Sequence, residues 1–68
     1  MTPIKDYIGK SFVNRHFHFI CNCIMNLDII GTVCDYEIVG TEVVLLVSNN
    51  DKIIRIGLNT PALMIKEI

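Results

Sequence analysis

The sequence predicts a small, mostly β domain that begins with one short helix and continues as five strands. The chain has 68 residues, enough for a single domain that spans residues 1–68. Apolar residues recur with a helical period only within residues 1–10. After this segment, β-branched and aromatic residues dominate and often alternate with polar ones, as in half-buried strands. We therefore expect a helix at 1–10 and a β domain at 11–68.

The predicted helix has start and stop signals of its own. Thr2 can cap it, Pro3 suits its first position, and Gly9 is expected to end it. The apolar residues that share one of its faces are Ile4, Tyr7 and Ile8.

The predicted strands cover residues 12–25, 27–39, 42–48, 52–58 and 63–68. In the first strand, alternation places Phe17, Phe19 and Cys21 on the core face. Gly31 lies inside the second strand, where a glycine is typical of a bulge or a sharp bend. The third strand contains the continuous apolar run 43–47, which predicts burial on both of its faces.

Two connections carry clear turn signals. Residues 49–51, Asn-Asn-Asp, are typical of a hairpin turn between the third and fourth strands. Thr60, Pro61 and Ala62 predict a single helical turn before the last strand. One helix, five closely spaced strands and one such turn are the order of a small, five-stranded SH3-like barrel.

Two segments give this order a closer resemblance. Residues 30–37 contain Gly31, then an apolar residue, the aromatic Tyr36 and the acid Glu37; residues 54–59 contain Arg55, Gly57 and Asn59 between apolar positions. Together they resemble the two motifs of the Sm-like fold, the barrel family of ring-forming RNA-binding proteins. The position of the family's uracil-reading Asn is occupied here by Thr41 or Glu42, and Ile56 separates Arg55 from Gly57.

The resemblance implies a homo-oligomer whose fourth and fifth strands pair edge to edge to close a ring. Apolar residues occur at neighbouring positions of these strands, as expected when part of the surface meets another chain. The interface residues expected from these two strands are Ile53, Ile54, Ile56, Met64 and Ile65.

Single-stranded RNA is the nucleic acid that a barrel of this kind would bind, by stacking bases on aromatic side chains beside cations. The candidates are Tyr36 for stacking, with Arg55, Lys52 and Asn59 beside it. The basic residues are scattered and the net charge is −1, so neither duplex DNA nor an anionic membrane surface is an expected partner.

Composition places the chain among folded proteins of the cytoplasm. Hydrophobic residues make up 51% and charged residues 19%, which excludes disorder. The longest apolar run is far shorter than a membrane span, and no signal peptide is recognised. The three cysteines are an odd number, which favours reduced thiols in small buried side chains over a disulfide framework.

Catalytic and metal-binding patterns are weak. His16, His18, Cys21 and Cys23 invite a zinc interpretation, but alternation sends the histidines to one face of a strand and the cysteines to the other. No nucleophile with its base, and no phosphate-binding loop, is found. We therefore expect no enzyme activity, no cofactor and no metal, apart from a His16 and His18 pair shared between subunits.

Three functions remain open. The first is a small non-enzymatic β-barrel that self-associates and binds a protein or RNA partner. The second is a compact inhibitor of the phage or plasmid type that blocks a host enzyme, which small size and the absent catalytic set also fit. The third is a ring that binds metal or ligand at subunit contacts.

Overall fold

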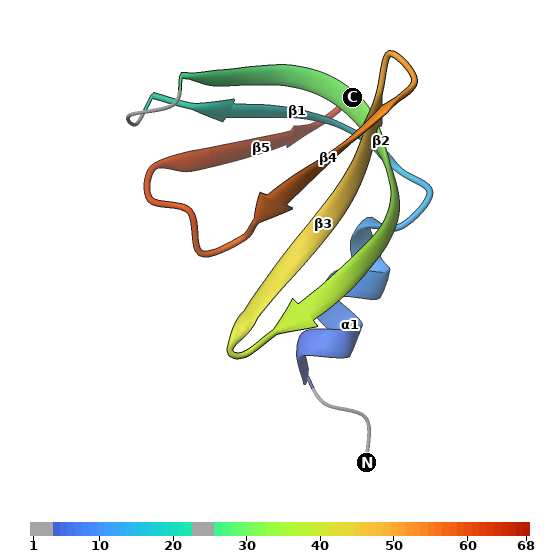
Figure 1. Ribbon diagram of the computed structural model, residues 1–68, viewed down its shortest axis with the longest axis vertical. Coiled ribbons are helices and arrows are strands. Elements are labelled where there is room, and N and C mark those ends of the chain that lie inside the picture. Colours follow the sequence, from blue (N-terminus) through green and yellow to red (C-terminus); the bar gives the residue numbers. More distant parts are fainter. Residues whose placement is uncertain (1–3, 23–25) are drawn as a thin grey trace.

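The computed structural model describes residues 4–22 and 26–68, which form one helix and five strands (Figure 1). The elements are α1 (Ile4–Phe12), β1 (His16–Cys21), β2 (Leu27–Val39), β3 (Glu42–Asn49), β4 (Lys52–Gly57) and β5 (Leu63–Glu67). The strands form one antiparallel sheet in the order β4-β3-β2-β1-β5. The predicted mostly β fold with a short N-terminal helix is therefore confirmed.

The sheet is open. Within the described residues, β4 pairs with β3 alone and β5 pairs with β1 alone, so both keep a free edge. The long strands β2 and β3 curve along their length, and α1 lies beside them (Figure 1). Because no pairing between β4 and β5 closes the described sheet, the expected barrel is not confirmed.

The core lies on one face of this curved sheet. Its buried members are Phe17, Phe19, Val33, Val43, Leu45, Val47 and Ile56. Buried and more exposed residues alternate along β1, as predicted, and Cys21 is buried on the core face with the two phenylalanines. We call this face the inner face and the opposite one the outer face.

The outer face of β3 is also covered, as the apolar run of this strand predicts. Val44 is buried and Leu46 is half-buried, although neither belongs to the inner core. Arg55 on β4 is opposite Leu46 and Glu37 on β2 is opposite Val44 in the strand register. The Arg55 Nη2 donates to Glu37 Oε2 at 2.8 Å, so this ion pair crosses β3 above the two apolar side chains.

The helix ends later than its glycine suggests. Gly9 lies inside α1 and is buried against the Tyr36 ring. A Cβ at this position would lie 2.3 Å from the ring, so the close contact requires a glycine. The helix continues to Phe12, and β1 begins only at His16. Residues 12–15, which were expected in the first strand, therefore lie outside it. The proposed caps Thr2 and Pro3 lie outside the described residues. The apolar stripe of α1 points away from the sheet, with Ile4 77% and Tyr7 65% exposed.

A bulge in β2 changes which residues face the core. Val33 pairs with Val47 and Asp35 with Leu46, so Cys34 is the extra residue. Gly31 was expected to mark such an irregularity, but it stays in register, opposite Phe17. Its role is a close approach, since a Cβ at Gly31 would lie 2.6 Å from the Ser48 carbonyl oxygen. Beyond the bulge, Tyr36 pairs with Leu45 and faces inward.

The turns agree with the sequence at one connection and differ at the other. The predicted hairpin turn is confirmed, but Asn49 pairs with Lys52, so the loop has only two residues. Asn50 and Asp51 both have positive φ angles, 48° and 66°, as such a two-residue loop requires. The segment before β5 is not a helical turn, because Ala62 has a φ of 61°. There, Thr60 donates its hydroxyl proton to the Gly57 carbonyl at 2.7 Å.

Candidate interaction edges

The free edge of β4 presents unpaired main-chain groups. The Leu58 N–H donates to the Val43 carbonyl at 2.9 Å, which sets the alternation of hydrogen-bonded pairs between β3 and β4. By this alternation, the N–H and C=O groups of Ile53, Arg55 and Gly57 point away from β3. The Gly57 carbonyl accepts hydrogen bonds from Thr60, whereas the main-chain groups of Arg55 have no partner within the described residues.

The free edge of β5 has the same construction. The Ile68 N–H donates to the His16 carbonyl at 3.1 Å, and the alternation that follows from it directs the even-numbered residues of β5 toward β1. The main-chain groups of Leu63, Ile65 and Glu67 therefore point outward. The Leu63 N–H already donates to the Thr60 carbonyl at 3.3 Å. Within the described residues, each edge thus offers two fully unpaired residues to another strand, Ile53 and Arg55 on β4 and Ile65 and Glu67 on β5, the pattern that β-strand addition uses.

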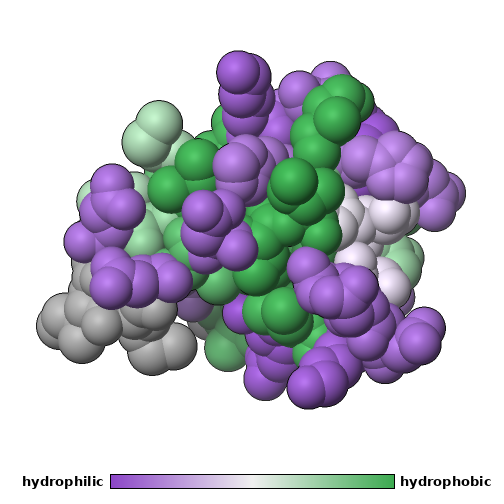
Figure 2. All heavy atoms as spheres, turned by 90° about the horizontal axis from the view of Figure 1, so that it is seen from above, coloured by the Kyte–Doolittle hydropathy of each residue, from purple (hydrophilic) through white to green (hydrophobic). Residues whose placement is uncertain are grey.

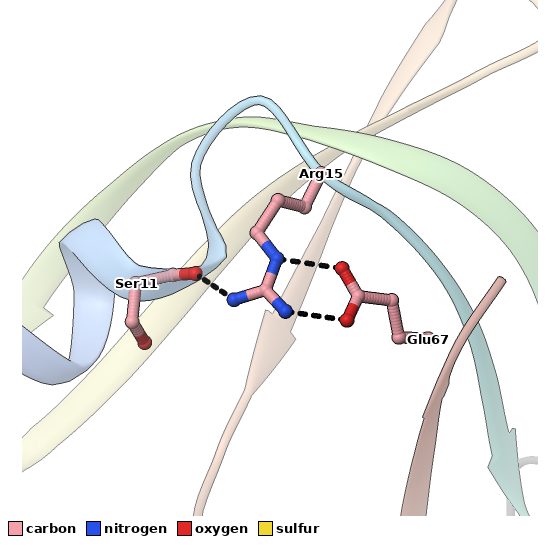
Figure 3. Close-up of polar contacts among 3 residues, drawn as sticks. All are labelled: Ser11, Arg15 and Glu67. Atoms are coloured by element: carbon pink, nitrogen blue, oxygen red, sulfur yellow. Dashed lines mark hydrogen bonds and ion pairs between the residues drawn. The ribbon is translucent and has the colours of Figure 1, made fainter.

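A polar clasp holds the end of β5 in place (Figure 3). The Arg15 Nε donates to Glu67 Oε2 at 2.6 Å, and its Nη2 donates to the other carboxylate oxygen. The Arg15 Nη1 donates to the Ser11 carbonyl at 2.7 Å, near the end of α1. Because the guanidinium also lies 5.4 Å from the Phe17 ring centroid, the clasp joins α1, β1 and β5.

The clasp predicts a pH dependence. The Arg15 guanidinium lowers the pKa of Glu67, first through its hydrogen bonds. A carboxylate with a lowered pKa in the folded state stabilises the protein above its unfolded pKa and loses this contribution as the pH falls through the folded value. We expect Glu67→Gln to lower the urea midpoint at about pH 7 and to match the wild type at about pH 3, below the ordinary glutamate pKa.

Urea titrations of both proteins at the two pH values provide the measurement, and Lys66→Gln, one residue earlier on the outer face, is the control. An undiminished difference between Glu67→Gln and the wild type at the acidic pH would contradict an ionic clasp.

The predicted interface residues divide between the two faces. Ile53 on β4 is 58% exposed and Met64 on β5 is 61% exposed, and both side chains lie on the outer face. Ile54 and Ile65 are half-buried on the inner face. Ile56 is a core residue, 4% exposed, and its main chain is directed toward β3. Of the five, Ile53 and Met64 thus have side chains available to a neighbouring molecule.

A hydrophobic band is visible on the surface seen from above (Figure 2). It crosses the middle of the view between hydrophilic flanks, on the side where β1, β2 and the β3–β4 turn lie uppermost in Figure 1. Ile30 on β2 and Ile53 on β4 are each 58% exposed on the outer face of these strands. The edge strand β4 therefore carries an exposed apolar side chain, Ile53, that a partner can bury.

The predicted RNA-binding residues are not brought together. Tyr36 lies on the inner face against Gly9, and its hydroxyl donates to Asp6 Oδ1 at 3.1 Å. Burial, followed by the contact with Asp6, raises the pKa of the Tyr36 hydroxyl above its ordinary value. Arg55 lies on the opposite face, paired with Glu37. Within one chain, a base stacked on Tyr36 is thus separated by the sheet from the Arg55 guanidinium.

The other two RNA candidates lie at the two ends of β4. Lys52 begins the strand and is exposed beside the Asn50–Asp51 turn. Asn59 follows the strand, and its N–H donates to Glu42 Oε2 at 3.2 Å. These residues therefore frame the free edge of β4 and do not form a cluster.

The histidines lie on the outer face, as predicted, and each has a polar partner. The His16 Nδ1 is 2.7 Å from the Thr32 hydroxyl, and the His18 Nε2 is 2.6 Å from Asp28 Oδ1. In the part of the chain that the structure describes, no three His, Cys, Asp or Glu residues are grouped to hold a metal ion. Cys23, part of the zinc interpretation, lies outside that part.

The cysteines differ from the expectation of buried, reduced thiols. Cys34 is free but exposed, because strand alternation after the buried Val33 places it on the outer face, and its sulfur donates to the Leu46 carbonyl at 3.2 Å. Cys21 is buried, as expected, but it is disulfide-bonded, so the prediction of a reduced thiol is wrong for this residue. Among residues 4–22 and 26–68, no helix is long and apolar enough to cross a membrane.

Glu67 is a residue of the β5 edge that the sequence did not indicate. Glu67 is 52 positions from Arg15, so no local pattern signals their pairing.

Comparison with protein-family models, curated proteins and solved structures finds no match to this chain.

Proposed function

We propose that this protein is a small non-enzymatic β module that self-associates through the free edges of β4 and β5. The observation that carries the proposal is that, within the described residues, both edges present outward, unpaired main-chain groups of two residues each. Long free edges are normally blocked in monomeric proteins, because they pair with other chains. Here the edge strands also expose Ile53 and Met64, which a neighbouring molecule would cover.

A closed ring of the Sm-like kind is the assembly that we favour. In such a ring, β4 of one subunit pairs with β5 of the next, and every copy uses one edge of each type, so no edge remains free. The strand order β4-β3-β2-β1-β5 supports this arrangement, because it puts the two strands at opposite ends of the sheet. In this proposal the assembled ring, and not the single chain, binds the partner, a protein or single-stranded RNA.

The test compares two substitutions of Arg55. Arg55→Pro removes the outward N–H without removing a hydrogen bond to β3, whereas Arg55→Ala keeps the N–H. Both lose the pair with Glu37, so this loss cancels in the comparison. We expect native mass spectrometry to show a multimer for the wild type and Arg55→Ala. We expect Arg55→Pro to weaken each contact at least about fivefold, the effect of one hydrogen bond.

Circular dichroism of both variants establishes that they are folded. A monomeric wild type at micromolar concentration would refute the proposal, and so would a folded Arg55→Pro variant that assembles like Arg55→Ala. Oligonucleotide retained by the multimer would support RNA as its partner. A multimer free of nucleic acid that also ignores added single-stranded RNA would leave protein as the partner.

A further inference from the structure

A cavity opens beside the free edge of β4, where the sheet remains open. Its volume is about 310 Å³, and its lining residues are Cys21, Leu27, Ile54, Arg55, Ile56, Gly57 and Thr60. Cys21 and Ile56 are buried, and Leu27 and Ile54 are half-buried against the core. The cavity therefore has apolar walls that are anchored in the folded sheet.

The polar groups of the cavity are few and lie at the edge of β4. The N–H and C=O of Arg55 point away from β3 and have no partner among the described residues. The Thr60 hydroxyl already donates its proton to the Gly57 carbonyl, so it can act toward a ligand as an acceptor. The one charged lining residue, Arg55, has its guanidinium paired with Glu37. This set of groups favours a neutral ligand with a donor or acceptor of its own.

The volume limits the size of that ligand. An apolar cavity of about 150 Å³ holds one benzene molecule, and drug-sized ligands occupy about 300–1,000 Å³. We propose that this cavity binds a small neutral molecule with an apolar body about the size of a fused bicyclic aromatic ring. One polar group of the ligand donates to the Thr60 hydroxyl oxygen, which is not part of the β4 edge. The site needs a single chain and does not depend on the self-association proposed above.

Indole is a suitable probe, because it is neutral, bicyclic and carries one N–H donor. We expect indole added to the ¹⁵N-labelled wild type to shift the amide signals of residues 54–57 and Thr60 in a saturable way. Ile54→Trp places an indole group on a residue that lines the cavity, and we expect it to weaken binding at least about tenfold. Val39→Trp is the matched control, since residue 39 is 51% exposed at the end of β2 and does not line the cavity, and it should bind like the wild type.

Leu27→Phe is a second variant that fills the same cavity, for use if Ile54→Trp fails to fold. The dispersion of the amide spectrum shows whether each variant is folded. Equal binding by Ile54→Trp or Leu27→Phe and the wild type would overturn the proposal. It would also be overturned by shifts that centre on the exposed stripe Ile4, Tyr7 and Ile8 of α1. Absence of indole binding in a wild-type multimer, with binding in monomeric Arg55→Pro, would assign the cavity to a second copy of the chain and overturn the small-molecule assignment.

Discussion

Replacing Phe19 by alanine is expected to cause the largest loss of stability of any single substitution considered for this protein. Phe19 is fully buried at the centre of β1, and its ring lies 5.9 Å from that of Phe17. Truncation of a buried phenylalanine costs about 3–5 kcal/mol, because the cavity left behind is not refilled. A chain of 68 residues is stable by about 3–10 kcal/mol. The substitution therefore removes much or all of the free energy of unfolding.

Urea denaturation followed by circular dichroism measures this loss. Ile30→Ala is the control, because residue 30 is apolar and lies on neighbouring β2, but its side chain is 58% exposed on the outer face. We expect a loss below about 1 kcal/mol for the control. Equal losses for the two variants would contradict the assignment of the core to the inner face.

Gly31→Ala is expected to destabilise the protein, although the same change usually stabilises a strand. Away from close contacts, alanine is favoured over glycine by about 0.5–1 kcal/mol within a strand. At residue 31, however, the new Cβ would lie 2.6 Å from both the Ser48 carbonyl oxygen and Val47 Cγ1. A main-chain carbonyl in a paired strand cannot turn aside, so β2 and β3 must separate locally. We expect a loss of about 1–3 kcal/mol, the usual cost of overpacking.

Gly57→Ala is the matched control for this prediction. Its Cβ would meet the carboxylate of Glu42 at 2.3 Å, but this is the end of a flexible side chain that can rotate toward solvent. The control should therefore lose less stability than Gly31→Ala in the same urea titrations. A Gly31→Ala variant as stable as the wild type would show that β2 and β3 do not approach each other this closely.

Four of the five strands could be predicted to within one residue at each end. Their boundaries are set by local signals, such as the alternation in β2 and the Asn50–Asp51 turn after β3. The faces of β1 were also predictable, because a regular strand has a period of two residues. These features depend on neighbours in the sequence, which a single chain displays.

Features that depend on distant contacts could not be predicted. A glycine often ends a helix, but Gly9 is an interior helical residue, and the Tyr36 ring packs against it. Regular alternation would place Tyr36 on the outer face with Ile30 and Thr32, yet one extra residue at Cys34 turns it inward. Whether the sheet closes is likewise decided by the curvature of β2 and β3 and not by any one segment.

The candidate edges were foreseen in part. The sequence and its resemblance pointed to the fourth and fifth strands, which are the two edge strands of the described sheet. Composition did not distinguish the exposed side chain of Ile53 from the buried one of Ile56, because both are isoleucines in one apolar strand. The Arg15–Glu67 clasp and the cavity beside β4 depend on contacts between residues far apart in the chain.

The pairing of the first strand with the last has a kinetic consequence. Cys21 is opposite Leu63 and Phe17 is opposite Glu67, so the ladder between β1 and β5 closes a loop that contains β2, β3 and β4. Closing such a loop costs entropy before the ladder returns any stability, which slows folding relative to domains with local contacts. During synthesis, β1 can pair with β2 early, but its other edge stays open until the ribosome has released residue 67. In this interval, newly made chains are most exposed to aggregation.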